Sequence, residues 1–113
     1  MEVLENEENG AWVLAPRGRI DGVTCRPFEQ KLMSRIDSGP VAVVLDLAEL
    51  DYLSSAGLRV LLMGAKRQKA AKAGFALCCV QEHIREVLDV AGFTQILEIH
   101  EDRSAALRAL VAG

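Results

Sequence analysis

The chain has 113 residues, enough for one hydrophobic core and too few for two, so we expect a single domain over residues 1–113. Hydrophobic residues make up 50% and charged residues 26%, a globular composition in which no apolar run approaches the roughly 20 residues of a membrane span. The 13 basic and 16 acidic side chains give a net charge of −3, which argues against nucleic acid as a partner. The acidic start from Met1 to Glu5 lacks the features of a signal peptide, so the cytoplasm is the expected compartment.

The three cysteines are Cys25, Cys78 and Cys79, an odd number without the spacing of a metal site. On a strand, the adjacent pair would point to opposite faces of the sheet. We therefore interpret all three as small, reduced core residues, and we expect neither a metal ion nor another cofactor.

Hydrophobic periodicity and turn residues predict nine elements in the order ββαβαβαβα. The first half comprises two strands over residues 2–7 and 11–16, joined by the turn signal Asn9-Gly10, then a helix, then a buried strand over residues 41–47. Thr24 is the expected cap of the helix, with Pro27 in its first turn and Ser38-Gly39-Pro40 after its end. Apolar residues recur in it at helical spacing: Cys25, Phe28, Leu32 and Ile36.

The second half begins with a connection over residues 48–53. It continues with a helix over 54–73 stopped by Gly74, a strand over 75–80, a helix ended by Gly92, an edge strand over 96–100, and a final helix capped by Asp102. Phe93 is expected to pack back on the third helix. The apolar stripes of the last two helices are Ile84, Val87, Leu88 and Ala91, and Leu107, Leu110 and Val111.

This order predicts an α/β fold, because strands that alternate with helices run parallel and are joined by right-handed crossovers. We expect a mixed, mostly parallel sheet of four to five strands with about four helices. Functional residues of such sheets gather at the carboxyl ends of the parallel strands. Residues 46–57 lie at that edge.

The segment from Leu50 to Leu58 places two hydroxyls, Ser54 and Ser55, where a buried strand passes into a helix. One interpretation is that either serine caps the helix by accepting a hydrogen bond from a free N–H group. A second is that a phosphate added there faces those N–H groups and the positive end of the helix dipole, and carries new charge onto the surface. That would make the serine a switch.

A third interpretation, a nucleophilic serine, fits less well. The strained elbow G-x-S-x-G is absent, since the residues are Leu53-Ser54-Ser55-Ala56-Gly57. His83 and His100 are the histidines that could act as a base, and both lie in ordinary helix-start or strand-end contexts. We therefore do not expect an enzyme.

Several segments together resemble the STAS domain, the family of sulfate transporter and anti-sigma factor antagonist domains. They are Gly18-Arg19-Ile20-Asp21, Val43 to Leu47, Tyr52 to Leu62, Ile84 to Phe93, and Ser104 to Leu107. The resemblance runs over nearly the whole chain and implies the STAS fold.

The resemblance also implies a partner switch. The unphosphorylated antagonist binds an anti-sigma factor that is a serine kinase, which frees the sigma factor, and phosphorylation with ATP breaks the complex until a serine phosphatase resets it. By position Ser55 matches the phosphorylated serine, with Ser54 as the less favoured alternative, and Asp21 matches an acidic residue on the neighbouring loop. The implied partner surface comprises Asp21, Ser54, Ser55, Ala56, Gly57, Leu58 and Arg59. The family often has Asp and a second Ser where this chain has Ser54 and Ala56.

The same residues are compatible with other roles. Single STAS-like domains also serve as constitutive subunits of membrane lipid transporters. For Arg59, the alternatives are a place on a solvated helix face and a pairing with a partner or with the phosphate. For Asp21, they are a role in organising its own turn and a contact with the partner. Asp46 is expected to accept hydrogen bonds from loop N–H groups. Nothing in the composition requires more than a monomer.

Overall fold

The computed structural model describes residues 2–39 and 41–112, with side chains up to residue 110. The strands are β1 (Glu2–Glu8), β2 (Ala11–Ile20), β3 (Ala42–Asp46), β4 (Leu50–Leu53), β5 (Phe75–Cys78) and β6 (Glu98–His100). The helices are α1 (Cys25–Asp37), α2 (Ser55–Ala70), α3 (Glu82–Val90) and α4 (Arg103–Ala112), with a short 3-10 turn η1 (Phe93–Gln95) after α3.

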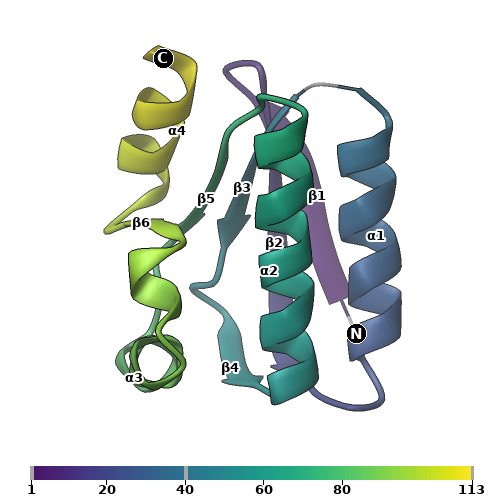
Figure 1. Cartoon of the computed structure of the whole chain (residues 1–113), viewed down its shortest axis with the longest axis vertical. Helices are drawn as coiled ribbons and strands as arrows, with labels where there is room; N and C mark the ends of the chain where they lie inside the picture. Colours follow the sequence, from purple (N-terminus) through teal and green to yellow (C-terminus); the bar gives the residue numbers. More distant parts are fainter. Residues whose placement is uncertain (1, 40, 113) are drawn as a thin grey trace.

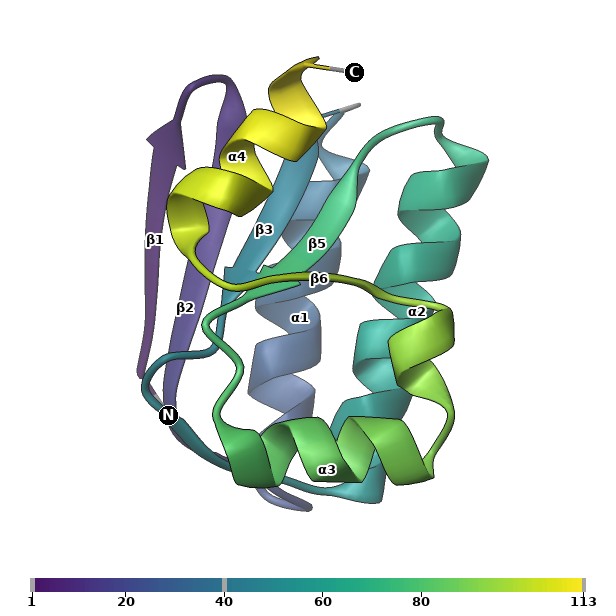
Figure 2. The same cartoon turned by 90° about the vertical axis from the view of Figure 1, so that its left-hand side faces the viewer.

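The strands form one mixed sheet in the order β1-β2-β3-β5-β6, in which β1 and β2 are antiparallel and the other pairs are parallel. Helices α1 and α2 pack on one face, where the larger core lies, and α4 covers part of the other face with a smaller core (Figures 1 and 2). Helix α3 lies across the end of the sheet beside β4 (Figure 2). The α/β fold with a mainly parallel sheet is therefore confirmed.

Strand β4 was not expected, since residues 48–53 were predicted to be a connection, and it raises the strand count from four or five to six. It pairs in parallel with the end of β2, beyond the residues of β2 that pair with β3, and the register of this pairing shifts between Gly18 and Arg19. Its burial does not alternate: Leu50 and Leu53 are buried, and the two residues between them are exposed. Without alternation a four-residue strand gives no period-two signal.

The turn predictions are confirmed at two positions and wrong at one. Asn9 and Gly10 both have positive φ, as a tight hairpin turn requires, and Gly92 takes the left-handed conformation after α3. Gly74 does not end α2. That helix ends at Ala70, and Lys72 takes the left-handed conformation, whereas Gly74 makes room for α4, because a Cβ there would lie 2.7 Å from Leu110 Cδ2.

Two further details differ from expectation. Thr24 does not cap α1 through its side chain, because its hydroxyl is bonded within the preceding loop. Cys79 lies beyond the end of β5 with a positive φ of 58°, so its side chain is not on the opposite face from that of Cys78. Asp102 does cap α4, where its Oδ1 accepts from the Ala105 N–H over 2.7 Å.

The packing of the last helices agrees with the predicted stripes in part: Val87 and Ala91 are exposed and Leu110 is half-buried, contrary to expectation. Ile84, Leu88 and Leu107 are buried, and Phe93 packs against the larger core. The predicted burial of Val111 lies outside the described side chains. Within residues 2–39 and 41–112, no helix is long and apolar enough to cross a bilayer.

Candidate functional site

The two serines at the junction of β4 and α2 have different roles. Ser54 precedes the helix with extended backbone, and its Oγ accepts from the Gly57 N–H over 3.2 Å, so it is the N-cap. Its own N–H donates to Ile20 O over 2.9 Å, which fixes the junction to the end of β2. Ser55 is the first helical residue and is exposed. The helix therefore begins one residue later than predicted, and the Ser55 side chain faces solvent.

Gly57 sets how closely α2 approaches the sheet. It is buried, and a Cβ at this position would lie 2.6 Å from Leu53 Cδ1 and 2.7 Å from Ile20 Cγ2. A side chain would push the first turn of the helix away from β2 and β4. Leu58 is 8% exposed and anchors the same turn. The close packing of Gly57 and Leu58 against the core thus fixes the position of Ser55 in the first turn of α2.

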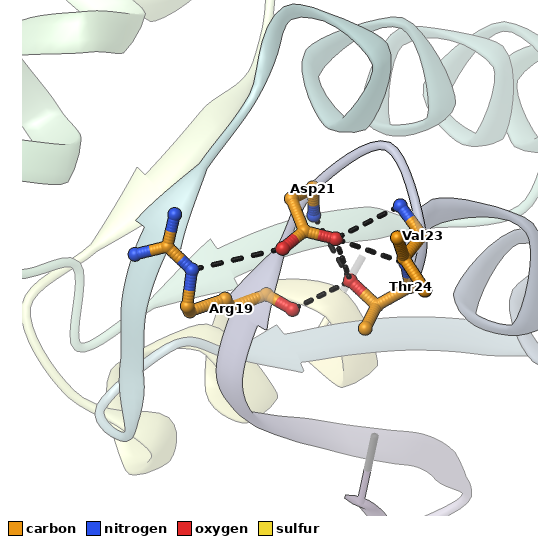
Figure 3. A network of polar contacts seen from close by, with 4 residues as sticks. All are labelled: Arg19, Asp21, Val23 and Thr24. Atoms are coloured by element: carbon orange, nitrogen blue, oxygen red, sulfur yellow. Dashed lines mark hydrogen bonds and ion pairs between the residues drawn. The ribbon is translucent and has the colours of Figure 1, made fainter.

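Asp21 organises the loop between β2 and α1, as one of the two interpretations proposed (Figure 3). Its Oδ1 accepts from the N–H groups of Val23 and Thr24 over 2.9 and 3.1 Å. The Thr24 hydroxyl accepts from the Asp21 N–H and donates to Arg19 O. The hydrogen bonds from the Thr24 and Val23 N–H groups hold the pKa of Asp21 below its ordinary value. This loop and Ser55 lie at the same edge, since Ile20 contacts Ser54.

Arg19 connects this loop to β4. Its guanidinium lies over the Tyr52 ring, 4.2 Å from the centroid, and its Nε lies 3.6 Å from Asp21 Oδ2. Both contacts leave the side chain largely exposed, at 60%. Sequence reasoning did not single out Arg19, because its pairing with Tyr52 depends on the unexpected strand β4.

The other side of β4 is held by the start of α3. Gln81 Nε2 donates to Ala48 O and Leu50 O over 2.8 and 2.9 Å, and His83 Nε2 lies 2.7 Å from Asp51 O. A carbonyl oxygen only accepts, so His83 Nε2 carries the proton in this contact. Sequence reasoning missed both roles, because the partners lie more than 30 residues apart in the chain.

Ser55 lines a groove between α2 and α3. It has a volume of about 480 Å³. Its lining residues are Ser55, Leu58, His83, Glu86, Val87, Val90 and Ala91. Val90 is 90% exposed, and Val23 at the other side of the site is 85% exposed. The candidate site is therefore a surface with an apolar groove, not an enclosed pocket.

Arg59 lies one turn after Ser55 and is exposed. In the part of the chain that the structure describes, no carboxylate forms an ion pair with it. Burial, reinforced by Glu29, raises the pKa of the Cys25 thiol, and the Arg59 guanidinium opposes that rise.

The Asp46 side chain accepts a hydrogen bond from a loop N–H group, as expected. Its Oδ1 accepts from the Ala48 N–H over 3.0 Å, and its Oδ2 accepts from Arg103, which also bonds Glu8. Asp46, Cys78 and Cys79 have potential ligand atoms within 4.8 Å of one another. However, the carboxylate already binds the Arg103 cation, and burial raises the pKa of both thiols. These residues do not suit a metal ion.

Comparison with known proteins places this geometry in a family. Residues 3–106 match the model of the STAS domain. The chain is 35% identical over 109 residues to a Bordetella bronchiseptica protein named "putative anti-sigma factor antagonist BtrV", a match that covers 96% of this chain and 94% of that protein. The crystal structure of an anti-sigma factor antagonist from Mycobacterium paratuberculosis superposes with a TM-score of 0.89 at 25% identity, covering 96% and 92% of the two chains. A structure from Thermotoga maritima with a TM-score of 0.90 and 18% identity shows the same fold, covering 96% and 93%.

The chain therefore belongs to the STAS domain family. Within that family, two relatives that match it over nearly its whole length carry the name anti-sigma factor antagonist. The fold and the family inferred from the sequence are both confirmed.

Proposed function

We propose that this chain is an anti-sigma factor antagonist whose unphosphorylated form binds an anti-sigma factor with serine kinase activity, and that phosphorylation of Ser55 switches this binding off. Binding would release the sigma factor. The observation that carries the proposal is that Ser55 is exposed at the first position of α2, whereas the Ser54 hydroxyl is engaged as the N-cap. The name of its relative BtrV supports the antagonist role.

The start of α2 suits a phosphate on Ser55. The first N–H groups of a helix lack intrahelical acceptors, and the dipole is positive at this end. The first turn of α2 carries no acidic residue that would repel the new charge. The modified chain should therefore keep its fold.

The same phosphate would disrupt the complex with the kinase. It adds about −1.5 to −2 charges to the contact surface. In the complex Ser55 faces the nucleotide that supplied the phosphoryl group, and the phosphates of that nucleotide repel the product. A serine phosphatase would restore the binding form.

The proposed partner surface comprises Asp21, Ser54, Ser55, Ala56, Gly57, Leu58 and Arg59. Its members contribute differently. Ser55 and Arg59 are exposed and available for direct contact. The other members shape the surface rather than contact the partner through free polar groups. The side chains of Asp21 and Ser54 accept hydrogen bonds within the chain, and Gly57 is buried.

We propose no enzymatic activity for the site. A nucleophilic serine needs a base within hydrogen-bond reach, and His83 Nε2 is committed to Asp51 O. His100 lies on β6 and contacts Glu98 over 2.6 Å. The site therefore supports binding rather than turnover.

The test begins with capture of a serine kinase from a lysate of the source organism by the tagged chain, followed by purification of both proteins. With ATP, the wild type and Ser54→Ala should gain one phosphate by intact mass, and Ser55→Ala none. Ser55→Asp should bind the kinase about 100-fold more weakly, because it places a charge in a desolvated contact. Full modification of Ser55→Ala, or recovery of a lipid-transporter ATPase instead of a kinase, would show that the proposal is wrong.

A further inference from the structure

The groove beside Ser55 has fixed walls. One wall is the first turn of α2, with Ser55 and Leu58, and the other is α3, with His83, Glu86, Val87 and Val90. The start of α3 is tied to β4 through the bonds of Gln81 and His83 to backbone carbonyls. These bonds fix α3 relative to β4, and β4 leads directly into α2. The groove is therefore formed before any partner binds, and binding requires little ordering of this chain.

The apolar part of the groove includes two valines that are exposed to solvent. Val90 is 90% exposed and Val87 is 37% exposed. They lie three residues apart, so they are neighbours on the helix surface. Isolated exposed apolar residues are common, but two on one face that also line a groove indicate a contact surface.

Glu86 is the acidic residue that lines the groove beside these valines. Glu82, Glu86 and Val90 follow each other at intervals of four residues and are all exposed, so they form one row along α3. Among the residues that the structure describes, neither Glu82 nor Glu86 has an ion-pair partner, and no lysine or arginine lines the groove. Arg85 and Glu82 lie outside the lining, and Glu82 is one turn before Glu86 in this row. An apolar floor bordered by carboxylates is complementary to a basic amphipathic segment.

We infer that this groove docks an amphipathic segment of the kinase partner, with apolar side chains against Val87 and Val90 and lysine or arginine side chains against Glu82 and Glu86. The inference rests on the proposed function, since the occupant belongs to the kinase that acts on Ser55 at the end of the groove. Docking is separate from the switch: the groove holds a segment outside the catalytic site, while Ser55 faces the nucleotide.

The test uses matched variants of the full chain and the purified kinase. Val90→Glu and Val90→Lys both remove the apolar contact and differ only in charge sign. We expect Val90→Glu to weaken binding about tenfold and Val90→Lys about 100-fold, and Glu86→Lys to weaken it about tenfold. Ile96→Lys is the control, because Ile96 is 60% exposed and lies outside the groove, and it should bind within about twofold of the wild type. A photo-crosslinking residue at position 90 should attach to a kinase peptide rich in lysine or arginine.

The outcomes separate the two proposals. If Ser55→Asp loses binding while Val90→Lys binds as the wild type does, the groove inference fails and the proposed function stands. If Val90→Glu binds more weakly than Val90→Lys, or if the crosslinked peptide is acidic, the partner segment is not basic. If the crosslink joins two copies of this chain, the groove is a self-association surface and the inference is overturned. If the wild type binds no serine kinase, the proposed function itself fails.

Discussion

The Gly57 N–H donates to Ser54 Oγ over 3.2 Å, so the two adjacent serines before α2 are not equivalent. The Ser54 hydroxyl stabilises the helix start, and the Ser55 hydroxyl takes no part in that cap. Ser54→Ala should lower the free energy of unfolding by about 1 kcal/mol through loss of the cap. Ser55→Ala should change it by less than about 0.5 kcal/mol. Urea denaturation of both variants measures this difference, and equal losses would contradict the assignment.

Phosphorylation of Ser55 should leave the chain at least as stable as before. A phosphate in the first turn of α2 interacts favourably with the helix dipole, by about 0.3–1 kcal/mol at an exposed position. The melting temperature of the phosphorylated chain at low salt should therefore equal or exceed that of the unmodified chain. A marked fall would mean that the modification acts by disrupting the fold rather than the complex.

Gly57→Ala should destabilise the chain by about 1–3 kcal/mol, because the new methyl group overlaps Leu53 and Ile20 and forces α2 away from the sheet. Gly22→Ala is the matched control. No atom lies within 4 Å of a Cβ at position 22, and the φ of Gly22 is not positive. Its unfolding free energy should stay within about 0.5 kcal/mol of the wild type. Similar curves for the two variants would show that the close approach of α2 is not required.

Arg103→Met should destabilise the chain by about 3 kcal/mol, since it leaves the Asp46 carboxylate, which is 8% exposed, without its cation. Adding Asp46→Asn should recover part of the loss, because the neutral amide oxygen can still accept from the Ala48 N–H. The exposed pair of Arg67 and Asp37 provides the comparison: Arg67→Gln should cost at most about 1 kcal/mol. Denaturant titrations of the wild type, Arg103→Met, Asp46→Asn and the double variant give the coupling between Arg103 and Asp46, and the same measurement on Arg67→Gln gives the comparison.

Glu5 should make the stability depend on pH at the acidic end. Its hydrogen bond from Arg35, with a further contribution from Lys31, holds the pKa of Glu5 below its ordinary value of 4.5. A carboxyl whose pKa is lower in the folded chain stabilises the fold above the unfolded pKa, and this contribution is lost as the pH falls through the folded pKa. The stability difference between wild type and Glu5→Gln should thus be largest near neutral pH and shrink below about pH 4. A difference that grows with acidity would reverse the assigned sign.

Local sequence signals predicted the elements with strong patterns. The apolar run of β3, the turn at Asn9-Gly10, the stop at Gly92 and the cap at Asp102 each depend on residues within a few positions of one another. The family resemblance was equally accessible, because it rests on segments along the whole chain. The sequence did not predict the exact ends of several elements, and it did not predict β4. That strand has no alternating pattern and forms because it pairs with the end of β2.

Hydrophobic period, turn residues and motif spacing are local or additive properties, so the amino-acid sequence was enough to predict the fold class, the family and the segment that holds the two serines. Which of the two serines is free depends on three-dimensional contacts, since the Ser54 hydroxyl is positioned by the bond of its backbone to Ile20, far earlier in the chain. The groove also depends on such contacts, because it needs α3 held beside β4 by Gln81 and His83. Contacts between residues more than 30 positions apart leave no periodic trace in the sequence, and these contacts shape the site.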